Sequence, residues 1–295
     1  MNSASPLADQ LDHRRNAIRP DLADARLAGI AQAAAFSEGE RMQVITHVAP
    51  VHRQPRKDSG LDTEALCGDT VRVFEITEGW AWVQLERDAY VGYLPVDRLG
   101  PASPPPTHRV LTVRTFAYPG PSMKLPRAMT LPFGGRVHVL RHHGDFAVVS
   151  GVAGLAESFV WAAHLAEVGH VETDWVAAAE RLVGVPYLWG GRSTAGLDCS
   201  GLTQLALDAG GITAPRDSDM QEAELGHPVM VDDPLSGLLR GDLVFWRGHV
   251  GIMQDGHLLL HANGHHMLVA SEPLATATAR ILAKGGGPIT SIKRL

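Results

Sequence analysis

Residues 198–211 read DCSGLTQLALDAGG, and this stretch decides the fold predicted for the second half of the chain. Its apolar residues recur at helical spacing until two glycines end the pattern, which predicts a helix beginning near Cys199. The preceding stretch 185–192 reads VPYLWGGR, and its proline and paired glycines cannot continue a helix. At a helix N-terminus the unpaired backbone N–H groups and the macrodipole favour a nucleophilic thiolate. A free cysteine can equally be a small buried hydrophobe.

Two histidines follow in short apolar runs. His249 lies in residues 243–253, which predict two strands around a turn, and His261 ends the apolar run 258–260. The residues between these runs signal a hairpin, so the register of that hairpin decides whether the two imidazoles meet.

Two lengths of the hairpin loop are compatible with the sequence. A two-residue loop at 255–256 would place the imidazoles on opposite faces. A three-residue loop at 254–256, with Gly256 left-handed, pairs Met253 with His257 and sets the imidazoles directly opposite each other. In that register one imidazole can orient the other as the base for the thiol.

Four motifs occur in order in this half of the chain, namely PYLWGG at 186–191, DCSG at 198–201, GDL at 241–243 and GHVGI at 248–252. Together they resemble the NlpC/P60 cysteine peptidases. The layout is most similar to members that cut γ-D-glutamyl-diaminopimelate bonds in murein peptides and carry bacterial SH3-like domains ahead of the catalytic domain. The resemblance implies a papain-like α+β domain with Cys199 as nucleophile, His249 as base and His261 as orienting group.

The resemblance also implies roles for the neighbours of the nucleophile. Tyr187 is expected beside Cys199 as an oxyanion donor or positioning group, and Trp189 is a candidate substrate-binding residue with plain packing as the alternative. Asp198 and Ser200 match residues that hold the free α-amine of the substrate's L-Ala. Helix capping is the alternative role for both.

Three more residues are predicted to contact the substrate. Arg216, in the loop after the helix, can pair with a substrate carboxylate or simply be solvated. In the relatives that the layout resembles, the first SH3-like domain closes the cleft with an acidic residue and a tyrosine. Glu64 and Tyr90 are the nearest matches, and the alternatives are that Glu64 is solvated and that Tyr90 packs in the barrel.

Glycine- and proline-containing stretches divide the rest of the chain into predicted domains. Short alternating runs predict strands in two small barrels, and an alanine-rich stretch at 22–36 predicts a helix. Helices are also predicted at 173–183 and 199–209. The predicted order is a polar and helical leader at 1–39, an SH3-like domain at 40–99, a proline-rich linker at 100–106, a second SH3-like domain at 107–168 and the NlpC/P60 domain at 169–295.

Composition narrows the class of protein. A chain of 295 residues with 45% hydrophobic residues suits two or three domains. A net charge of −6 without a basic block argues against nucleic acid or an anionic membrane as partner. No apolar run is long enough to span a membrane, and residues 1–20 lack the apolar core of a signal peptide. The two cysteines, Cys67 and Cys199, make no disulfide framework, which predicts a cytoplasmic protein. Cys67 is predicted to lie in a strand in the core of a barrel.

Three functions are compatible with these patterns. The first is a cysteine endopeptidase that cuts recycled murein peptides such as L-Ala-γ-D-Glu-diaminopimelate and needs no metal or cofactor. The second is a metal-dependent hydrolase that uses the cluster His257, His261, His265 and His266, although strand and turn are predicted there instead of the helix such a pair needs. The third is an inactive module that binds wall peptides, against which the intact cysteine and histidines argue. The sequence does not decide whether the third residue of the peptide is lysine or diaminopimelate, and it does not decide the oligomeric state.

Overall fold

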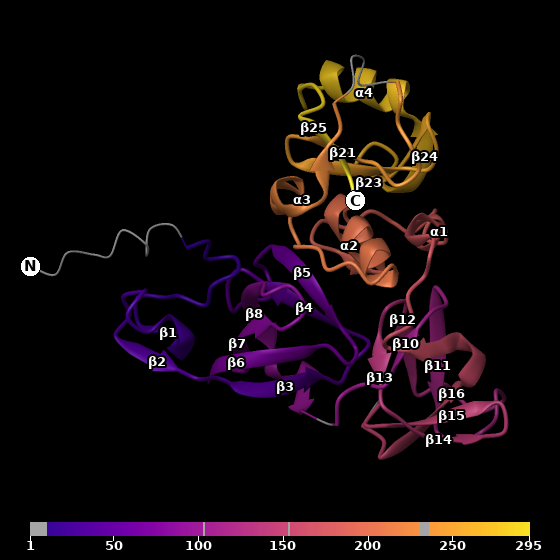
Figure 1. Cartoon of the computed structure of the whole chain (residues 1–295). Helices are drawn as coiled ribbons and strands as arrows, with labels where there is room; N and C mark the ends of the chain where they lie inside the picture. The colour runs from indigo at the N-terminus through magenta and orange to yellow at the C-terminus, as the bar shows by residue number, and fades with distance from the viewer. Residues whose placement is uncertain (1–10, 103, 153, 231–235) are drawn as a thin grey trace, which may run out of the picture. The chain divides into compact units, whose positions relative to one another are not determined.

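The computed structural model describes residues 11–102, 104–152, 154–230 and 236–295. The chain divides into two compact units, one up to Val168 and one from Gly169 to Leu295. The first unit consists mainly of strands, and the second combines helices with a sheet (Figure 1). Among the described residues, no helix is long and apolar enough to cross a membrane.

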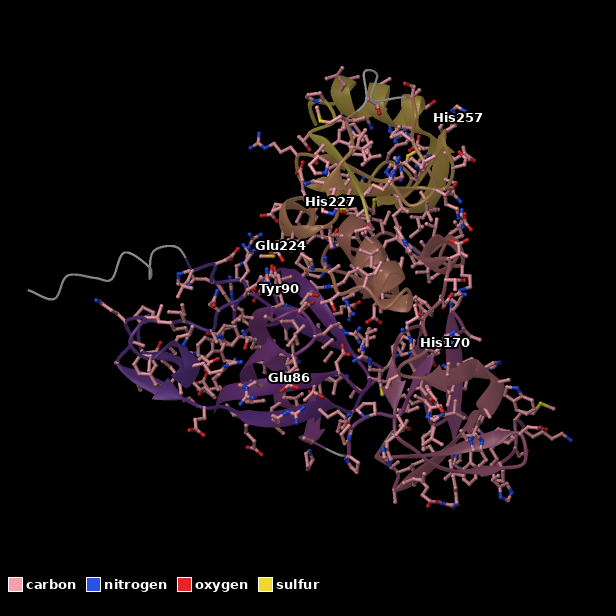
Figure 2. The ribbon with its side chains drawn as sticks, in the orientation of Figure 1. Glu86, Tyr90, His170, Glu224, His227 and His257 are labelled. Atoms are coloured by element: carbon pink, nitrogen blue, oxygen red, sulfur yellow. The ribbon has the colours of Figure 1, made fainter. Side chains whose placement is uncertain are left out.

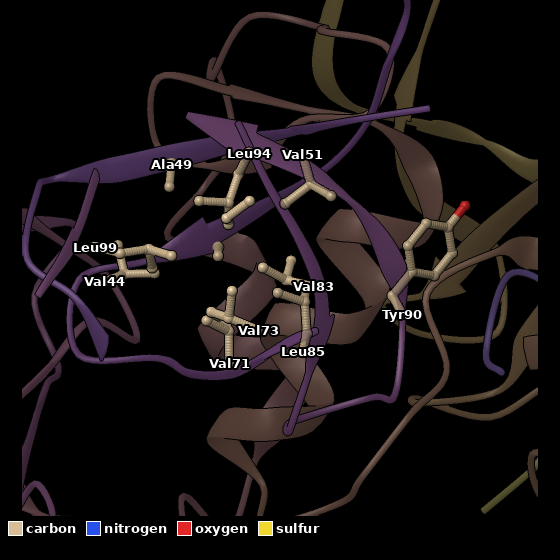
Figure 3. Close-up of a cluster of buried hydrophobic side chains, with 12 residues drawn as sticks. Val44, Ala49, Val51, Val71, Val73, Val83, Leu85, Tyr90, Leu94 and Leu99 are labelled. Atoms are coloured by element: carbon tan, nitrogen blue, oxygen red, sulfur yellow. The ribbon is translucent and has the colours of Figure 1, made fainter. Parts of the chain in front are cut away.

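The first barrel is a single seven-stranded antiparallel sheet in the order β5-β4-β8-β7-β6-β3-β9 (Figure 1). Its strands are β3 (Glu40–Val44), β4 (Val48–His52), β5 (Leu61–Leu66), β6 (Thr70–Thr77), β7 (Trp80–Leu85), β8 (Val91–Pro95) and β9 (Leu99–Pro101), with a 3-10 turn at Val96–Arg98. Alternate side chains point inward, and most of these are β-branched or leucine. Figure 3 shows them as one buried cluster that includes the ring of Tyr90.

The segment before this barrel corrects one prediction. Residues 22–36 form two short parallel strands, β1 (Leu22–Asp24) and β2 (Ala35–Ser37), with a 3-10 turn at Ala25–Leu27, and the predicted helix is wrong. Tertiary packing overrides the helix propensity of the alanines. Arg19 lies 4.3 Å over the ring of Trp82 and anchors the segment to the barrel. Residues 1–10 of the predicted leader lie outside the described part of the chain.

The second barrel consists of a three-stranded sheet, β13-β10-β17, and a five-stranded sheet, β12-β11-β16-β15-β14 (Figure 1). Its strands are β10 (His108–Val110), β11 (Arg114–Tyr118), β12 (Met129–Pro132), β13 (Arg136–Val137), β14 (Val139–His143), β15 (Phe146–Ser150), β16 (Glu157–Trp161) and β17 (Leu165–Glu167), with a 3-10 turn at Ala162–His164. The short alternating run at 136–140 is divided between the two sheets, because residues 136–137 belong to β13 and residues 139–143 to β14. Cys67 lies in the turn after β5, not in a strand, and packs in the core of this second barrel.

The predicted linker at 100–106 is shorter than expected. Its first two residues belong to β9, which pairs with β3 at the edge of the first sheet and places Pro101 opposite Met42. An edge strand tolerates proline because one side of the strand needs no backbone donor. Ser103 lies outside the described residues.

The second unit is built around a six-stranded antiparallel sheet in the order β20-β25-β21-β22-β23-β24. Its elements are α1 (Trp175–Glu180), β18 (Arg192–Ser193), β19 (Gly196–Leu197), α2 (Cys199–Ala209), α3 (Ser218–Glu224), β20 (His227–Pro228), β21 (Leu243–Trp246), β22 (His249–Met253), β23 (Leu258–Asn263), β24 (Leu268–Pro273), α4 (Leu274–Ala283) and β25 (Ser291–Arg294). The predicted helix 199–209 is confirmed. Helix α1 is shorter than predicted because it gives way to turns that end at Gly184, whose φ is +86°.

Helix α2 is buried on almost all sides. Within Cys199–Ala209, every residue except Asp208 is buried. This burial agrees with the near absence of a polar face on the helix. It packs beside α1 and beside strands β22 and β23. This packing brings the first turn of α2 to the strands that carry the two histidines.

Candidate active site

Asp198 fixes the start of the helix that carries Cys199. It is the N-cap of α2, and its Oδ1 accepts the backbone N–H of Gly201 at 2.7 Å. Its Oδ2 accepts the backbone N–H of Gly190 at 2.9 Å. One carboxylate therefore joins the glycine-rich loop to the first turn of the helix, so the capping role is confirmed.

The glycines of the two motifs allow this loop and helix to touch. A Cβ on Gly201 would lie 2.3 Å from the carbonyl oxygen of Gly191, and a Cβ on Gly191 would lie 2.5 Å from the carbonyl oxygen of Gly196. Both contacts are with backbone, which cannot move aside as a flexible side chain can. The spacing of PYLWGG and DCSG thus reflects a close backbone approach beside Cys199.

Arg216 is a buried partner of the cap and not an exposed residue. Its side chain is completely buried and contacts both oxygens of Asp198, at 3.0 Å and 2.7 Å. It also donates to the hydroxyl of Ser200 at 2.8 Å and lies 3.4 Å from the carbonyl oxygen of Gly191. The alternative of a solvated Arg216 is therefore wrong, and Asp198, Ser200 and Arg216 form one network under the first turn of α2.

The environment of Cys199 favours a neutral thiol. Burial, reinforced by the Asp198 carboxylate, raises the pKa of the Cys199 thiol to about 12. Backbone hydrogen bonds from Val250 and Ser200 oppose this rise in the pKa but do not overcome it. Burial therefore opposes the resting thiolate that the helix N-terminus favours. The contact with Val250 places the sulfur beside the residue that follows His249.

The hairpin between the histidines has neither of the two expected registers. Met253 pairs with Leu259, and Gln254 donates its N–H to the carbonyl oxygen of Leu258 at 2.8 Å. The three-residue loop is therefore 255–257 instead of 254–256. Gly256 is not left-handed, and Asp255 shapes the turn by accepting N–H groups at 2.7 Å and 2.8 Å.

This register keeps the imidazoles on one face but makes them diagonal neighbours. The His249 Nε2 atom lies 2.8 Å from the His261 Nδ1 atom, and the ring centroids are 5.1 Å apart. Burial, with the charges of His261 and Arg280, lowers the pKa of His249 to about 3. Burial also lowers the pKa of His261, so both imidazoles are neutral bases at pH 7.

Two residues of this site were missed by the sequence analysis. The His261 Nε2 atom lies 2.8 Å from Glu272 Oε1, and Arg280 of α4 binds both oxygens of the same carboxylate. Although burial favours the neutral acid, hydrogen bonds from His261 and Arg280 hold the pKa of Glu272 far below its usual range. The sequence near Glu272 gives no local signal for this role, because Glu272 becomes the diagonal neighbour of His261 only through the β23–β24 register.

Tyr187 and Trp189 lie on the loop that Asp198 holds. Burial, and then electrostatic interaction with Cys199 and Asp198, raises the pKa of Tyr187 to about 12, so its hydroxyl is a neutral donor. Trp189 is 70% exposed, and the alternative of plain packing is wrong for it. An exposed indole beside the nucleophile is a ready apolar contact for a ligand.

Comparison with known families agrees with this geometry. Residues 184–281 match the NlpC/P60 family model, and residues 51–99 match the model of the bacterial dipeptidyl-peptidase SH3 domain. The chain carries an NlpC/P60 domain. That domain contains the cysteine, both histidines, Glu272 and Arg280, and an SH3-like domain precedes it.

Curated relatives match about a third of the chain. Dipeptidyl-peptidase 6 of Lysinibacillus sphaericus is 35% identical over 88 residues, which are 30% of this chain and 31% of the relative. Gamma-D-glutamyl-L-lysine dipeptidyl-peptidase of Bacillus subtilis is 37% identical over 95 residues, which are 32% of this chain and 30% of the relative. The matched region is thus about a third of the length of each relative.

A solved structure shares the fold over most of the chain. An NlpC/P60 family protein from Bacillus cereus superposes with a TM-score of 0.71 and 19% identity, and the match covers 86% of this chain and 99% of that one. The NlpC/P60 endopeptidase of Photobacterium damselae has a TM-score of 0.59 at 16% identity, over 85% of this chain and 70% of that one. At these identities the likeness concerns the fold alone.

Glu64 and Tyr90 belong to the first unit and not to the NlpC/P60 domain. Glu64 lies in β5 opposite Pro50 and is buried, so the alternative of a solvated carboxylate is wrong. Tyr90 is labelled in Figure 2, and its ring packs in the barrel core. Figure 3 shows its hydroxyl pointing away from that cluster. Their contact with a substrate remains a prediction from the resemblance.

The remaining histidines of the NlpC/P60 domain do not form the arrangement that a metal would need. His257 lies in the hairpin loop (Figure 2), whereas His261 is on strand β23 and its two nitrogens contact His249 and Glu272. The His266 Nδ1 atom lies 3.0 Å from the side-chain oxygen of Asn263. Within the described ranges, no group of three or more His, Cys, Asp or Glu side chains is placed to hold a metal ion.

Proposed function

We propose that this protein is a cysteine peptidase that hydrolyses the γ-D-glutamyl-diamino acid bond of murein peptides. The NlpC/P60 domain and the dipeptidyl-peptidase relatives support a peptidase. One pair of contacts supports the cysteine mechanism. Cys199 contacts the backbone of Val250, and the adjacent His249 lies within hydrogen-bond distance of His261. Nucleophile, base and orienting group occur there in one place.

The pKa directions define how the first step proceeds. Cys199 begins as a neutral thiol, and His249 begins as a neutral base. During attack the Sγ proton passes to His249 while Sγ bonds to the carbonyl carbon, and the carbonyl electrons move onto the oxygen. The backbone N–H of Cys199 and the hydroxyl of Tyr187 are the candidate donors to that oxyanion.

The second half of the reaction returns the protein to its starting state. Collapse of the tetrahedral species breaks the C–N bond, and protonated His249 gives its proton to the leaving amine. A thioester to Cys199 remains. Water then attacks the thioester as His249 takes its proton, and the thiol leaves with that proton restored. No redox change and no external co-reactant is needed.

The substrate class follows from the relatives and from the resemblance. One relative is named for γ-D-glutamyl-L-lysine, so lysine and diaminopimelate are both candidates for the third position of the peptide. Asp198 is already paired with Arg216, so a substrate α-amine would share this carboxylate with the guanidinium. A cytoplasmic location is also proposed, because free thiols at Cys67 and Cys199 suit a reducing compartment.

A cleavage assay tests the proposal. The protein is incubated with L-Ala-γ-D-Glu-diaminopimelate, with its lysine counterpart and with N-acylated forms of both, and the products are identified by mass. We expect release of L-Ala-D-Glu from at least one free peptide and slower cleavage of the acylated forms. Tight binding of every peptide without any product would contradict the proposal and favour a binding module.

A further inference from the structure

The contacts of Glu272 assign a proton position to each histidine of the site. Ionised carboxylates only accept hydrogen bonds, so the contact between Glu272 Oε1 and His261 Nε2 requires His261 to donate from Nε2. A neutral His261 then has its lone pair on Nδ1. The 2.8 Å contact between that atom and His249 Nε2 requires His249 to donate from Nε2. The lone pair of His249 is therefore on Nδ1.

We propose that Glu272, held by Arg280, is a positioning residue that fixes His249 in the tautomer with a basic Nδ1, the nitrogen that does not contact His261. The role rests on the proposed function, because only a general base needs its lone pair on one particular nitrogen. It acts through His261, whose side chain is completely buried and cannot exchange this partner for water. Neither Glu272 nor Arg280 contacts the reacting atoms.

Arg280 makes this a positioning effect more than a charge effect. It binds both oxygens of Glu272, and the two side chains are 16% and 8% exposed. The guanidinium offsets the carboxylate, so His261 meets a fixed acceptor without a strong bias toward the imidazolium. The other titratable or charged groups facing Glu272 are His261, His265 and His266, with His266 Nδ1 at 3.9 Å.

A second buried carboxylate in the same unit provides a matched control. Asp242 is completely buried and receives two 2.7 Å hydrogen bonds from Arg294, as well as the N–H of Leu239 at 2.8 Å. It has the same kind of ion pair as Glu272, but its hydrogen bonds are with Arg294 and Leu239 and not with an imidazole. Asp242→Asn therefore reproduces the cost of neutralising a buried partner of arginine without touching the histidines.

The first measurement reads the tautomers directly in the intact protein. Long-range ¹H–¹⁵N correlation spectra at neutral pH, assigned with His249→Asn and His261→Asn proteins, are expected to show both imidazoles protonated at Nε2. Glu272→Gln places an NH2 group against an N–H of either Arg280 or His261, and we expect the single tautomer of His261 to be lost. Asp242→Asn should leave both signals unchanged.

The second measurement uses peptide hydrolysis. For Glu272→Gln we expect kcat to fall about tenfold or more while KM changes less than about twofold. The reason is that the wrong tautomer of His249 raises the activation barrier of hydrolysis without weakening substrate binding. Arg280→Met keeps the acceptor but removes its counter-charge. We expect the acid limb of its kcat/KM profile to move up by about one pH unit. Asp242→Asn should move neither kcat nor this limb.

Two results would overturn the positioning role. One is a wild-type protein in which His261 or His249 carries its proton on Nδ1. The other is a folded Glu272→Gln protein with the kcat of Asp242→Asn. Failure of the proposed function looks different, since it would appear as no cleavage by the wild-type protein or as cleavage by Cys199→Ala. The tautomer measurement on the wild-type protein does not depend on cleavage or on a variant that folds.

Discussion

Replacing Arg216 by methionine should destabilise the first turn of α2 far more than an exposed arginine replacement would. The side chain of Arg216 is completely buried and donates to both oxygens of Asp198 and to Ser200. Its removal leaves a carboxylate buried without its counter-ion. Breaking a buried pair in this way costs about 3–5 kcal/mol, which is a large part of a typical domain stability.

Arg240→Met is the matched control for that variant. Arg240 is 37% exposed and pairs with Asp174 and Glu180, which are 51% and 33% exposed, so the loss of each exposed pair should cost no more than about 1 kcal/mol. Hydrogen–deuterium exchange of the α2 amides, followed by mass spectrometry, measures the free energy of local opening in both proteins. An Arg216→Met protein with unchanged exchange and only a raised KM would refute the argument, because it would make Arg216 a substrate ligand alone.

Four further outcomes follow from the site. Gly201→Ala should destabilise the domain by about 1–3 kcal/mol in urea denaturation, since its Cβ would lie 2.3 Å from the Gly191 oxygen; an unchanged midpoint would contradict this close approach. Because burial raises the pKa of Cys199 to about 12, its alkylation by iodoacetamide should keep rising above pH 8.5, and a plateau below that pH would show a thiolate. Because burial lowers the pKa of His249 to about 3, its base form persists below pH 6.5, so the acid limb of kcat/KM should lie below that value. His261→Ala should lower kcat much more than it raises KM, and the reverse pattern would assign His261 to substrate binding.

The parts of the site predicted from sequence are those fixed by local patterns. Helical spacing and paired glycines located α2 correctly, and the parity of the hairpin loop placed His249 and His261 on one face. The exact loop was missed because Asp255, and not a left-handed Gly256, shapes the turn. One residue of shift changed direct opposition into a diagonal contact, which long imidazole side chains tolerate.

The parts that were missed depend on contacts distant in sequence. The buried pairing of Arg216 with Asp198 was missed because nothing in the loop of Arg216 shows that Asp198 caps a helix beside it. Glu272 and Arg280 required the β23–β24 register and the docking of α4. The burial of Cys199 also depends on distant contacts, because it is set by the packing of α2 against β22, and it opposes the thiolate that a helix N-terminus favours.

The central claim is that Cys199 is the nucleophile, and one comparison tests it most directly. Cys199→Ala and Cys67→Ala proteins are incubated with the free peptide that the wild-type protein cleaves, and the products are measured by mass. Cys67 is an equally buried thiol in the core of the second barrel, so its variant controls for loss of a cysteine. The account predicts no product from Cys199→Ala and undiminished cleavage by Cys67→Ala. Product formation by folded Cys199→Ala protein would contradict it.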